Sequence, residues 1–357
     1  MTIDEANRDG LRRRLVLSGA ALVARTVVAR SAAAATVAAT SAAVVSVAPN
    51  RAFAQGAVRR TVRIIVPVTA GAGPDLIARI LQPRLQARLQ ARGEHSVVVE
   101  NRPGGAGTIA YEAVAKSPPD GTTLLVAPSA MTTVPHLHPK LPYDLFKSFT
   151  PITNLGSTGL ALVVHHALPP KNVPEFVAYA KARPGELHYA SPGNASGHHL
   201  GMELFKLKTG INLVHVPYKG AAGATHDLIA GRIPVMFLPI HLALPLLKAG
   251  QVRSLGVSLR ERHPLFPDMP TLREQGVTDY DVDLWIGLWG PAGMAPELLT
   301  KLNADVRAIV VEPDSREHFA RQGLIPNVGT PAAFAKLIRD DYERWGTVIR
   351  DAKITAD

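Results

Sequence analysis

From Thr61 onward the hydrophobic positions follow two alternating patterns, short runs rich in β-branched residues and longer stretches with an apolar residue every three or four positions. The short runs are typical of buried strands and the longer stretches of helices. The first run, residues 62–66, ends at Pro67, passes through the small-residue loop 68–75 and leads into a helical pattern that continues to Leu89. Strand, small-residue loop and helix in this order predict a parallel α/β sheet, in which ligands bind at the carboxyl ends of the strands.

The same order recurs in residues 97–111, VVVENRPGGAGTIAY. Gly104, Gly105 and Gly107 allow the backbone to approach a ligand closely, and the first N–H groups of the following helix lie at the positive end of its dipole. This loop can therefore hold an anion. Its spacing matches neither a Walker A loop nor G-x-G-x-x-G, so an ordinary βα turn is the alternative interpretation.

The strand and helix pattern starts again after the apolar run 155–164, behind a group of prolines. Two further small-residue loops precede helices in this second part, at residues 191–199 and 217–223. Residues 281–290 form a strand-like run that is long enough to return to the first part. We therefore expect two lobes, the first made of residues 61–158 and 286–357 and the second of residues 159–285. Two helices, 296–310 and 332–349, are predicted to close the chain.

Residues 1–54 have the pattern of an export signal peptide. A basic start, Arg12-Arg13-Arg14-Leu15-Val16, precedes a long alanine-rich stretch, and Ala52-Phe53-Ala54 has the small-x-small form of a cleavage site. The paired arginines before apolar residues are typical of the twin-arginine route, with the Sec route and a disordered basic arm as alternatives. We expect a periplasmic protein whose leader is cleaved near Ala54.

The charge of the chain changes when the leader is removed. The full chain has 39 Lys+Arg and 29 Asp+Glu, and its first 54 residues hold seven and three of these, so the remainder carries 32 against 26. A net charge of +6 without a basic run interleaved with aromatics does not indicate nucleic-acid binding, although a mildly positive field suits small anions. The chain has no cysteine, which excludes disulfides, thiolate metal sites and cysteine nucleophiles.

Four glycine-rich helix starts, two in each expected lobe, favour capture of an anion over catalysis. Backbone donors at helix starts contribute roughly 0.3–1 kcal/mol each by charge and dipole, and charge-assisted hydrogen bonds add about 1.5–3 kcal/mol. That is enough for micromolar binding of a carboxylate with no catalytic residue and no cofactor.

The competing enzyme hypothesis needs a nucleophile and a base. No G-x-S-x-G elbow is present, but Ser191 followed by His198 and His199 leaves a Ser/His hydrolase open as an alternative. Adjacent histidines on a helix cannot both face one metal ion, and no H-E-x-x-H motif accompanies them, so we expect no metal site.

Several candidate functional residues have two possible interpretations. Asp75 suits a helix cap better than a catalytic acid. His199 is either a helix-start side chain held by its neighbours or a ligand contact, and Lys219 is either a solvated loop residue or a carboxylate partner. Trp285 and Trp289 indicate packing at the lobe junction rather than a stacking platform.

Several motifs in a fixed order resemble the Bug family of periplasmic solute-binding proteins, the extracytoplasmic receptors of tripartite tricarboxylate transporters. The resemblance covers essentially the whole chain after the leader. It rests on Val99-Glu100-Asn101-Arg102-Pro103-Gly104, Pro119-Asp120-Gly121, Leu141-Pro142-Tyr143-Asp144, Tyr189-Ala190-Ser191 with Gly193-Asn194, and His215-Val216-Pro217-Tyr218-Lys219-Gly220.

The resemblance implies a two-lobe α/β Venus-flytrap fold of the type II periplasmic-binding class that closes on a small carboxylate and delivers it to membrane permease subunits. It also implies a monomer and no catalysis, and a ligand sensor that docks on another receptor is the alternative. The ligand-contacting residues carried over to this chain are Val68, Thr69, Gly71, Gly73, Asp75, Ser129, Ser191, Gly193, Asn194, Ser196, His199, Tyr218, Lys219, Gly220 and Leu238.

Four departures from the family pattern predict a more apolar pocket. Leu238 stands where the family usually has an Asp, Pro192 replaces a small hydroxyl residue, Met131 a polar residue and Ala72 a glycine. We therefore expect an aromatic or aliphatic carboxylate as the ligand rather than an amino acid or citrate.

Overall fold

The computed structural model describes residues 60–91 and 95–356. Residues 55–357 form one compact unit. The predicted leader, with its paired arginines and its cleavage site near Ala54, lies outside the described residues.

The strands form one continuous sheet with the order β2-β1-β3-β9-β4-β7-β5-β6, and β8 and β10 also pair with β4. The first-lobe strands are β1 (Arg60–Val66), β2 (His95–Asn101), β3 (Thr123–Pro128), β9 (Asp283–Pro291) and β10 (Ile325–Pro326). The second-lobe strands are β5 (His188–Ser191), β6 (Val214–Pro217), β7 (Val235–Pro239) and β8 (Val252–Val257), and β4 (Phe149–His165) serves both lobes. Strands β1, β2 and β3 pair in parallel, as do β5, β6 and β7, so each lobe has the predicted parallel core.

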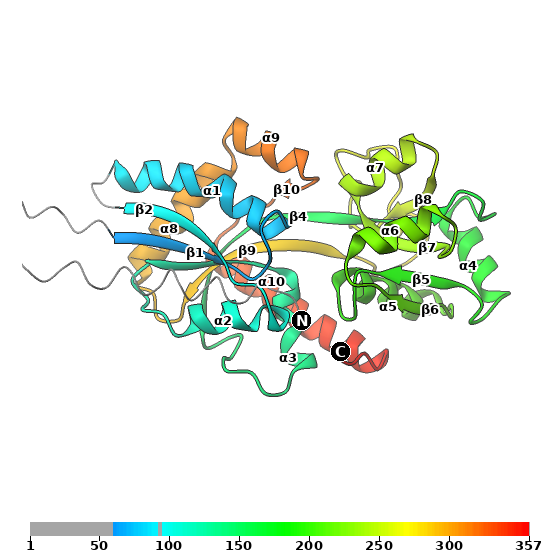
Figure 1. Cartoon of the computed structure of the whole chain (residues 1–357), viewed down its shortest axis with the longest axis horizontal. Helices are drawn as coiled ribbons and strands as arrows, with labels where there is room; N and C mark the ends of the chain where they lie inside the picture. The colour runs from blue at the N-terminus through cyan, green and yellow to red at the C-terminus, as the bar shows by residue number, and fades with distance from the viewer. Residues whose placement is uncertain (1–59, 92–94, 357) are drawn as a thin grey trace, which may run out of the picture. The chain divides into compact units, whose positions relative to one another are not determined.

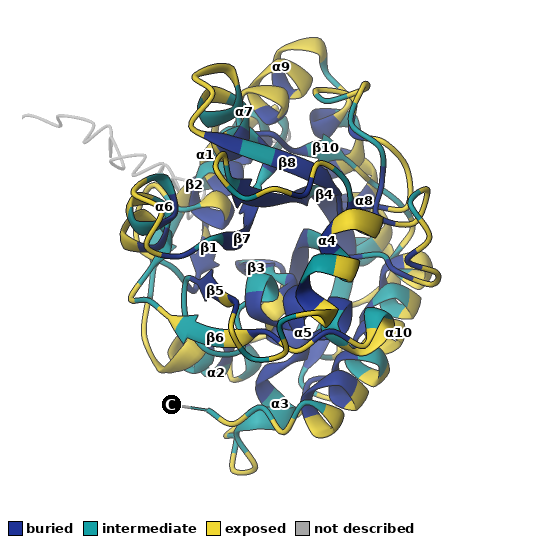
Figure 2. Cartoon of the chain, turned by 90° about the vertical axis from the view of Figure 1, so that its right-hand side faces the viewer, coloured by how far each residue is buried: buried dark blue, intermediate teal, exposed yellow. Residues whose placement is uncertain are grey.

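Helices connect the parallel strands in both lobes. Those of the first lobe are α1 (Gly73–Gln90), α2 (Thr108–Ala115), α3 (Val134–Leu137), α8 (Pro296–Val310) and α9 (Pro313–Arg321), with short 3₁₀ turns η1 (Gly105–Gly107) and η2 (Ser129–Thr132). Those of the second lobe are α4 (Val173–Lys181), α5 (Gly197–Thr209), α6 (Ala221–Ile229) and α7 (Ile240–Lys248), and α10 (Pro331–Asp351) ends the chain. Figure 2 shows most strands buried, with β6 at the edge of the sheet an exception, and the outer faces of the helices exposed, as amphipathic helices over a sheet require.

Strand β4 connects the two lobes because its pairing partners change along its length. Residues from Phe149 to Gly159 pair with β9, whereas residues from Leu160 to His165 pair with β7 and β8. Figure 1 shows β4 and β9 running together between the lobes. We propose that the lobe boundary falls at this change of partner, near residue 159 on β4 and near the start of β9.

Helix α10 also contributes to both lobes. Phe334 and Ile338 in its first half belong to a first-lobe core cluster with Trp285 and Trp289. Side chains of its second half, among them Trp345, belong to the second-lobe cluster. The last turns of α10 thus pack on the second lobe, although the sequence led us to assign all of residues 286–357 to the first.

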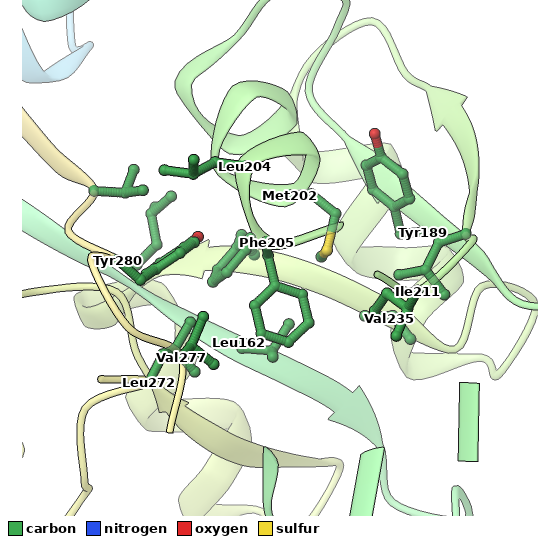
Figure 3. Packing of buried hydrophobic residues seen from close by; sticks show 14 of the residues in the cluster. Leu162, Tyr189, Met202, Leu204, Phe205, Ile211, Val235, Leu272, Val277 and Tyr280 are labelled. Atoms are coloured by element: carbon green, nitrogen blue, oxygen red, sulfur yellow. The ribbon is translucent and has the colours of Figure 1, made fainter. Parts of the chain in front are cut away.

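The second-lobe core is built around aromatic side chains from α5 and from the segment that returns to β9. Figure 3 shows Phe205 packed among Leu162, Val277 and Tyr280, and all four are at least 95% buried. Each such side chain stabilises the fold by roughly 1.5–3 kcal/mol relative to an exposed one. The two lobes therefore each have a core of their own.

The prediction that two helices close the chain is wrong, because α9 lies between them. Of its nine residues only Ser315 and Phe319 are buried. Because only one apolar side chain of α9 is buried, its sequence has no repeating apolar pattern from which a helix could be predicted.

Asp283 is the first residue of β9 and pairs with Gly159 of β4. Its ionisation makes the stability of the fold depend on pH. Burial raises its pKa to about 7, and Asp281 and Asp341 nearby add to the effect. Its Oδ1 atom has no hydrogen-bond partner within the described part of the chain. Because an unfolded Asp loses its proton near pH 4, the folded state binds one proton more between pH 4 and pH 7, and stability is lost as the pH rises through that range.

We expect Asp283→Asn to melt at a higher temperature than the wild type at pH 8 and at nearly the same temperature at pH 4. Melting curves across this range, with the exposed Asp268→Asn as the control, measure the effect. An equal difference at both pH values would show that the ionisation of Asp283 is not responsible.

Candidate ligand-binding site

A cavity of about 590 Å³ lies where segments of both lobes meet. It is lined by the end of β1, the glycine loop before α2, the segment after β3 and the loop before α5, together with Ala356 of the C-terminal tail. Among the described residues that line it, none is Asp, Glu, Lys or Arg. An anion in this cavity would therefore meet backbone N–H groups and neutral polar side chains such as Thr133, Asn194 and Ser196.

Asp75 organises the loop between β1 and α1 from behind the cavity. Its side chain is almost fully buried, Oδ2 accepts from the Gly71 backbone N–H at 2.8 Å, and Oδ1 accepts from the Asn101 amide at 2.8 Å. The same Asn101 amide donates to the carbonyl of Val68, a cavity residue, at 3.0 Å. Asp75 therefore connects the loop between β1 and α1 to Asn101, which ends β2 just before the glycine loop.

The expected helix-cap role of Asp75 is replaced by this network. The N-cap position of α1 is Ala72, which makes no side-chain cap bond, and Asp75 lies three residues later. Burial opposes ionisation of the Asp75 carboxyl, but hydrogen bonds from Arg79, Gly71 and Asn101 outweigh it and hold the pKa below its ordinary value.

The loop before α2 has an unusual backbone. Gly104, Gly105, Ala106 and Gly107 all have positive φ angles, of 119°, 56°, 52° and 91°. At Gly107 a Cβ atom would lie 2.5 Å from the ring of Tyr111, so only glycine fits. The sequence identified this loop as an anion cradle, but our expected site residues did not include it.

The loop before α5 is held by side-chain hydrogen bonds, and two of the residues that make them, Ser191 and His199, do not line the cavity. Ser191 is fully buried, and its Oγ lies 2.6 Å from His215 Nε2 and 3.0 Å from the Gly193 carbonyl. His199 Nδ1 accepts from the Ala195 N–H at 3.0 Å, and Ser196 caps α5 by accepting from the His199 N–H. These bonds leave Asn194, Ala195 and Ser196 lining the cavity.

The histidine partner of Ser191 is His215, not His198 or His199 as the hydrolase alternative assumed. His215 comes from β6, which pairs in parallel with β5, and its ring stacks at 3.8 Å on that of His199. Burial, helped by the nearby His215 and Lys206, lowers the pKa of His199 to about 3. A neutral His199 ring is what allows Nδ1 to accept a hydrogen bond.

The structure brings some of the expected site residues to the cavity and places others behind it. Those that line it are Val68, Asn194 and Ser196. Ser129 lies between Pro128 and Ala130, both of which line the cavity, but its side chain is buried. Seven others do not line the cavity and lie in the adjoining loops or at the ends of the elements that these loops connect: Thr69, Gly71, Gly73, Asp75, Ser191, Gly193 and His199.

The loop after β6 supports its neighbour instead of lining the cavity. The Gly220 N–H donates to the Pro192 carbonyl at 2.9 Å, the Tyr218 hydroxyl donates to Asp227 at 2.7 Å, and Lys219 is exposed. Leu238 is fully buried in an apolar cluster of the second lobe. In this conformation Leu238 does not line the cavity, so it can change the polarity of the cavity only through the residues packed around it.

Sequence reasoning did not include Tyr111 or Ala356 among the site residues. Tyr111 follows the glycine loop at helical spacing, which is a signal that could have found it. Ala356 reaches the cavity only because the tail folds back after α10, where the Ile354 N–H donates to the Ile349 carbonyl at 2.9 Å.

No helix in residues 60–91 and 95–356 is long and apolar enough to cross a membrane. The same residues contain no group of three or more His, Cys, Asp or Glu side chains placed to hold a metal ion.

Residues 77–354 match the family described as "Tripartite tricarboxylate transporter family receptor". The protein BugT of Bordetella pertussis is 33% identical over 294 residues, which cover 82% of this chain and 89% of BugT. The chain therefore belongs to the tripartite tricarboxylate transporter receptors, and the resemblance to the Bug family is confirmed.

Solved structures of two bacterial proteins match the fold. Rpa4515 of R. palustris with adipate has a TM-score of 0.71 and 33% identity, covering 83% of this chain and 98% of that protein. MatC (Rpa3494) from Rhodopseudomonas palustris with bound malate has a TM-score of 0.67 and 30% identity, covering 81% and 99%. The predicted two-lobe α/β binding-protein fold is confirmed.

Proposed function

We propose that this receptor captures a small organic carboxylate with an apolar body in the cavity between its lobes. The observation that carries the proposal is a cavity lined by both lobes, built from glycine-rich loops and from side chains among which there is no Asp, Glu, Lys or Arg in the described part of the chain. The adipate and malate bound to similar proteins support a carboxylate. Backbone donors at the loops would hold the charged group, and Val68, Val134 and Leu137 would contact the carbon skeleton.

We further propose that the protein acts in the periplasm as a monomer and delivers its ligand to the permease subunits of a tripartite tricarboxylate transporter. The family to which the chain belongs supports the transport role over the sensor alternative. Restoration of ligand uptake in a deletion strain by the full chain, only when the permease genes are present, would distinguish transport from sensing.

The thermal-shift experiment that tests capture uses residues 55–357, which form one compact unit. Candidate ligands are adipate, benzoate- and phthalate-type acids, malate, citrate and glutamate, with calorimetry on those that bind. A ligand at 100 times its Kd stabilises the folded state by about 2.7 kcal/mol, which gives a clear melting shift. We expect aliphatic or aromatic acids to bind more tightly than citrate or glutamate. Tight glutamate binding with no response to the other acids would contradict the apolar pocket.

Ser191→Ala tests the proposal that the protein binds without catalysis. The Ser191 hydroxyl is buried and bonded to His215 and Gly193, so a substrate has no access to it. We expect no ester hydrolysis by either protein and a loss of about 1 kcal/mol of stability in the variant, the usual contribution of a hydrogen bond. Ester turnover by the wild type that the substitution abolishes would favour the hydrolase.

A further inference from the structure

Two alanines that line the cavity, one from each lobe, have a backbone conformation that alanine disfavours. Four non-glycine residues in the described chain have positive φ: Ala106 at 52°, Ala195 at 55°, Asp279 at 53° and Lys353 at 52°. Ala106 and Ala195 both line the cavity, Ala106 from the first lobe and Ala195 from the second.

Glycine would adopt the backbone conformation of these two positions without steric strain. A left-handed backbone strains an L-residue because Cβ crowds the following carbonyl, and alanine has no polar atom that could compensate locally, as the Asp279 side chain can. Glycine already occupies the neighbouring positive-φ positions 104, 105, 107 and 193. A strained residue that persists among such neighbours indicates a functional constraint.

The methyl groups of these alanines have no core to fill. Ala106 is exposed and Ala195 is only half-buried. The Ala195 N–H is already bonded to His199 Nδ1, so this residue offers a ligand its methyl group instead of its donor.

We infer that Ala106 and Ala195 are specificity-determining residues, whose two methyl groups contact the carbon skeleton of the bound carboxylate from opposite lobes. This inference rests on the proposed carboxylate capture. A chain of CH₂ groups gains from contact with both methyls, whereas a hydroxyl or ammonium group placed against them loses its hydrogen bonds to water. The two alanines thus favour an unsubstituted dicarboxylate such as adipate over a hydroxylated one such as malate.

The variants Ala106→Gly, Ala195→Gly and the double variant test this inference by calorimetry with adipate and malate. Each methyl contact is worth about one buried CH₂ group, so we expect the ratio of adipate to malate affinity to fall roughly fourfold per substitution and about fifteenfold in the double variant. The melting temperature is expected to stay level or rise, because glycine relieves the strain.

Asp279→Gly is the matched control. It places glycine at another positive-φ residue, at an exposed position that does not line the cavity, so it should leave the affinity ratio unchanged. Double-variant protein that binds both acids with the wild-type ratio would overturn the inference and leave carboxylate capture standing. Wild-type protein that binds no carboxylate would instead overturn the proposed function, and this inference with it.

Discussion

Replacing Asp75 with alanine is expected to lower the free energy of unfolding by about 3 kcal/mol and to abolish measurable carboxylate binding. The carboxylate accepts hydrogen bonds from Gly71, Asn101 and Arg79. The Arg79 side chain is 48% exposed and can return to water, so most of the cost comes from the two donors that stay buried. Binding is lost because the same network positions Val68 at the cavity.

Urea unfolding and calorimetry measure these two effects. Asp314→Ala is the matched control, since Asp314, like Asp75, directly follows a proline in the first turn of a helix, but it is exposed. We expect that control to change stability by less than about 0.5 kcal/mol. Similar losses in the two variants would mean that the network around Asp75 contributes nothing beyond its charge at the helix start.

The pH dependence of the Asp75 variant gives a second test. Because the pKa of Asp75 is lowered in the folded state, its contribution is present above pH 4 and lost as the pH falls further. The wild type should therefore lose more stability than Asp75→Ala on acidification below pH 4.

Replacing Asp341 with alanine is expected to cost about 3 kcal/mol of stability, because it removes a buried carboxylate that accepts from a buried indole N–H and from a partly buried guanidinium. Asp341 Oδ2 accepts from Trp285 Nε1 and Oδ1 from Arg344 Nη2, each at 2.5 Å, while Arg344 Nη1 donates to the Asp281 carbonyl. These contacts join α10 to β9 and to the segment that leads into it, where the chain crosses between the lobes. Without Asp341, the indole N–H and the partly buried guanidinium lose their acceptor.

Its neighbour Asp340 provides the control. Asp340 pairs with Lys336, and both side chains are more than half exposed, so Asp340→Ala should change stability by less than about 0.5 kcal/mol. Urea unfolding at pH 7 compares the two variants. Equal stability of Asp341→Ala and the wild type would show that burying the carboxylate costs as much as its two bonds contribute.

Local pattern was enough to predict the main strands and most helices, because apolar spacing depends only on which face of an element is buried. The helix over residues 296–310 begins and ends where its periodicity predicts. The glycine loop at 104–107 could also be predicted from local sequence, because glycine adopts positive φ angles that other residues disfavour. The family motifs then led to the two-lobe fold, which the comparisons confirmed.

Contacts between segments far apart in the chain were decided by the tertiary structure. Ser191 meets His215 instead of the nearer His198 because β5 and β6 pair in register, Tyr189 opposite His215. Ala356 reaches the cavity because the chain turns back after α10.

Spacing and residue type along the chain were sufficient to predict parallel strands followed by small-residue loops, and loops that suit an anion without a charged catalytic group. Which loop residues line the cavity and which support it, as with Ser196 and Ser191, was decided only by the tertiary structure. The physical reason is that local spacing sets the period of each element, whereas strand order and register set which side chains share a space.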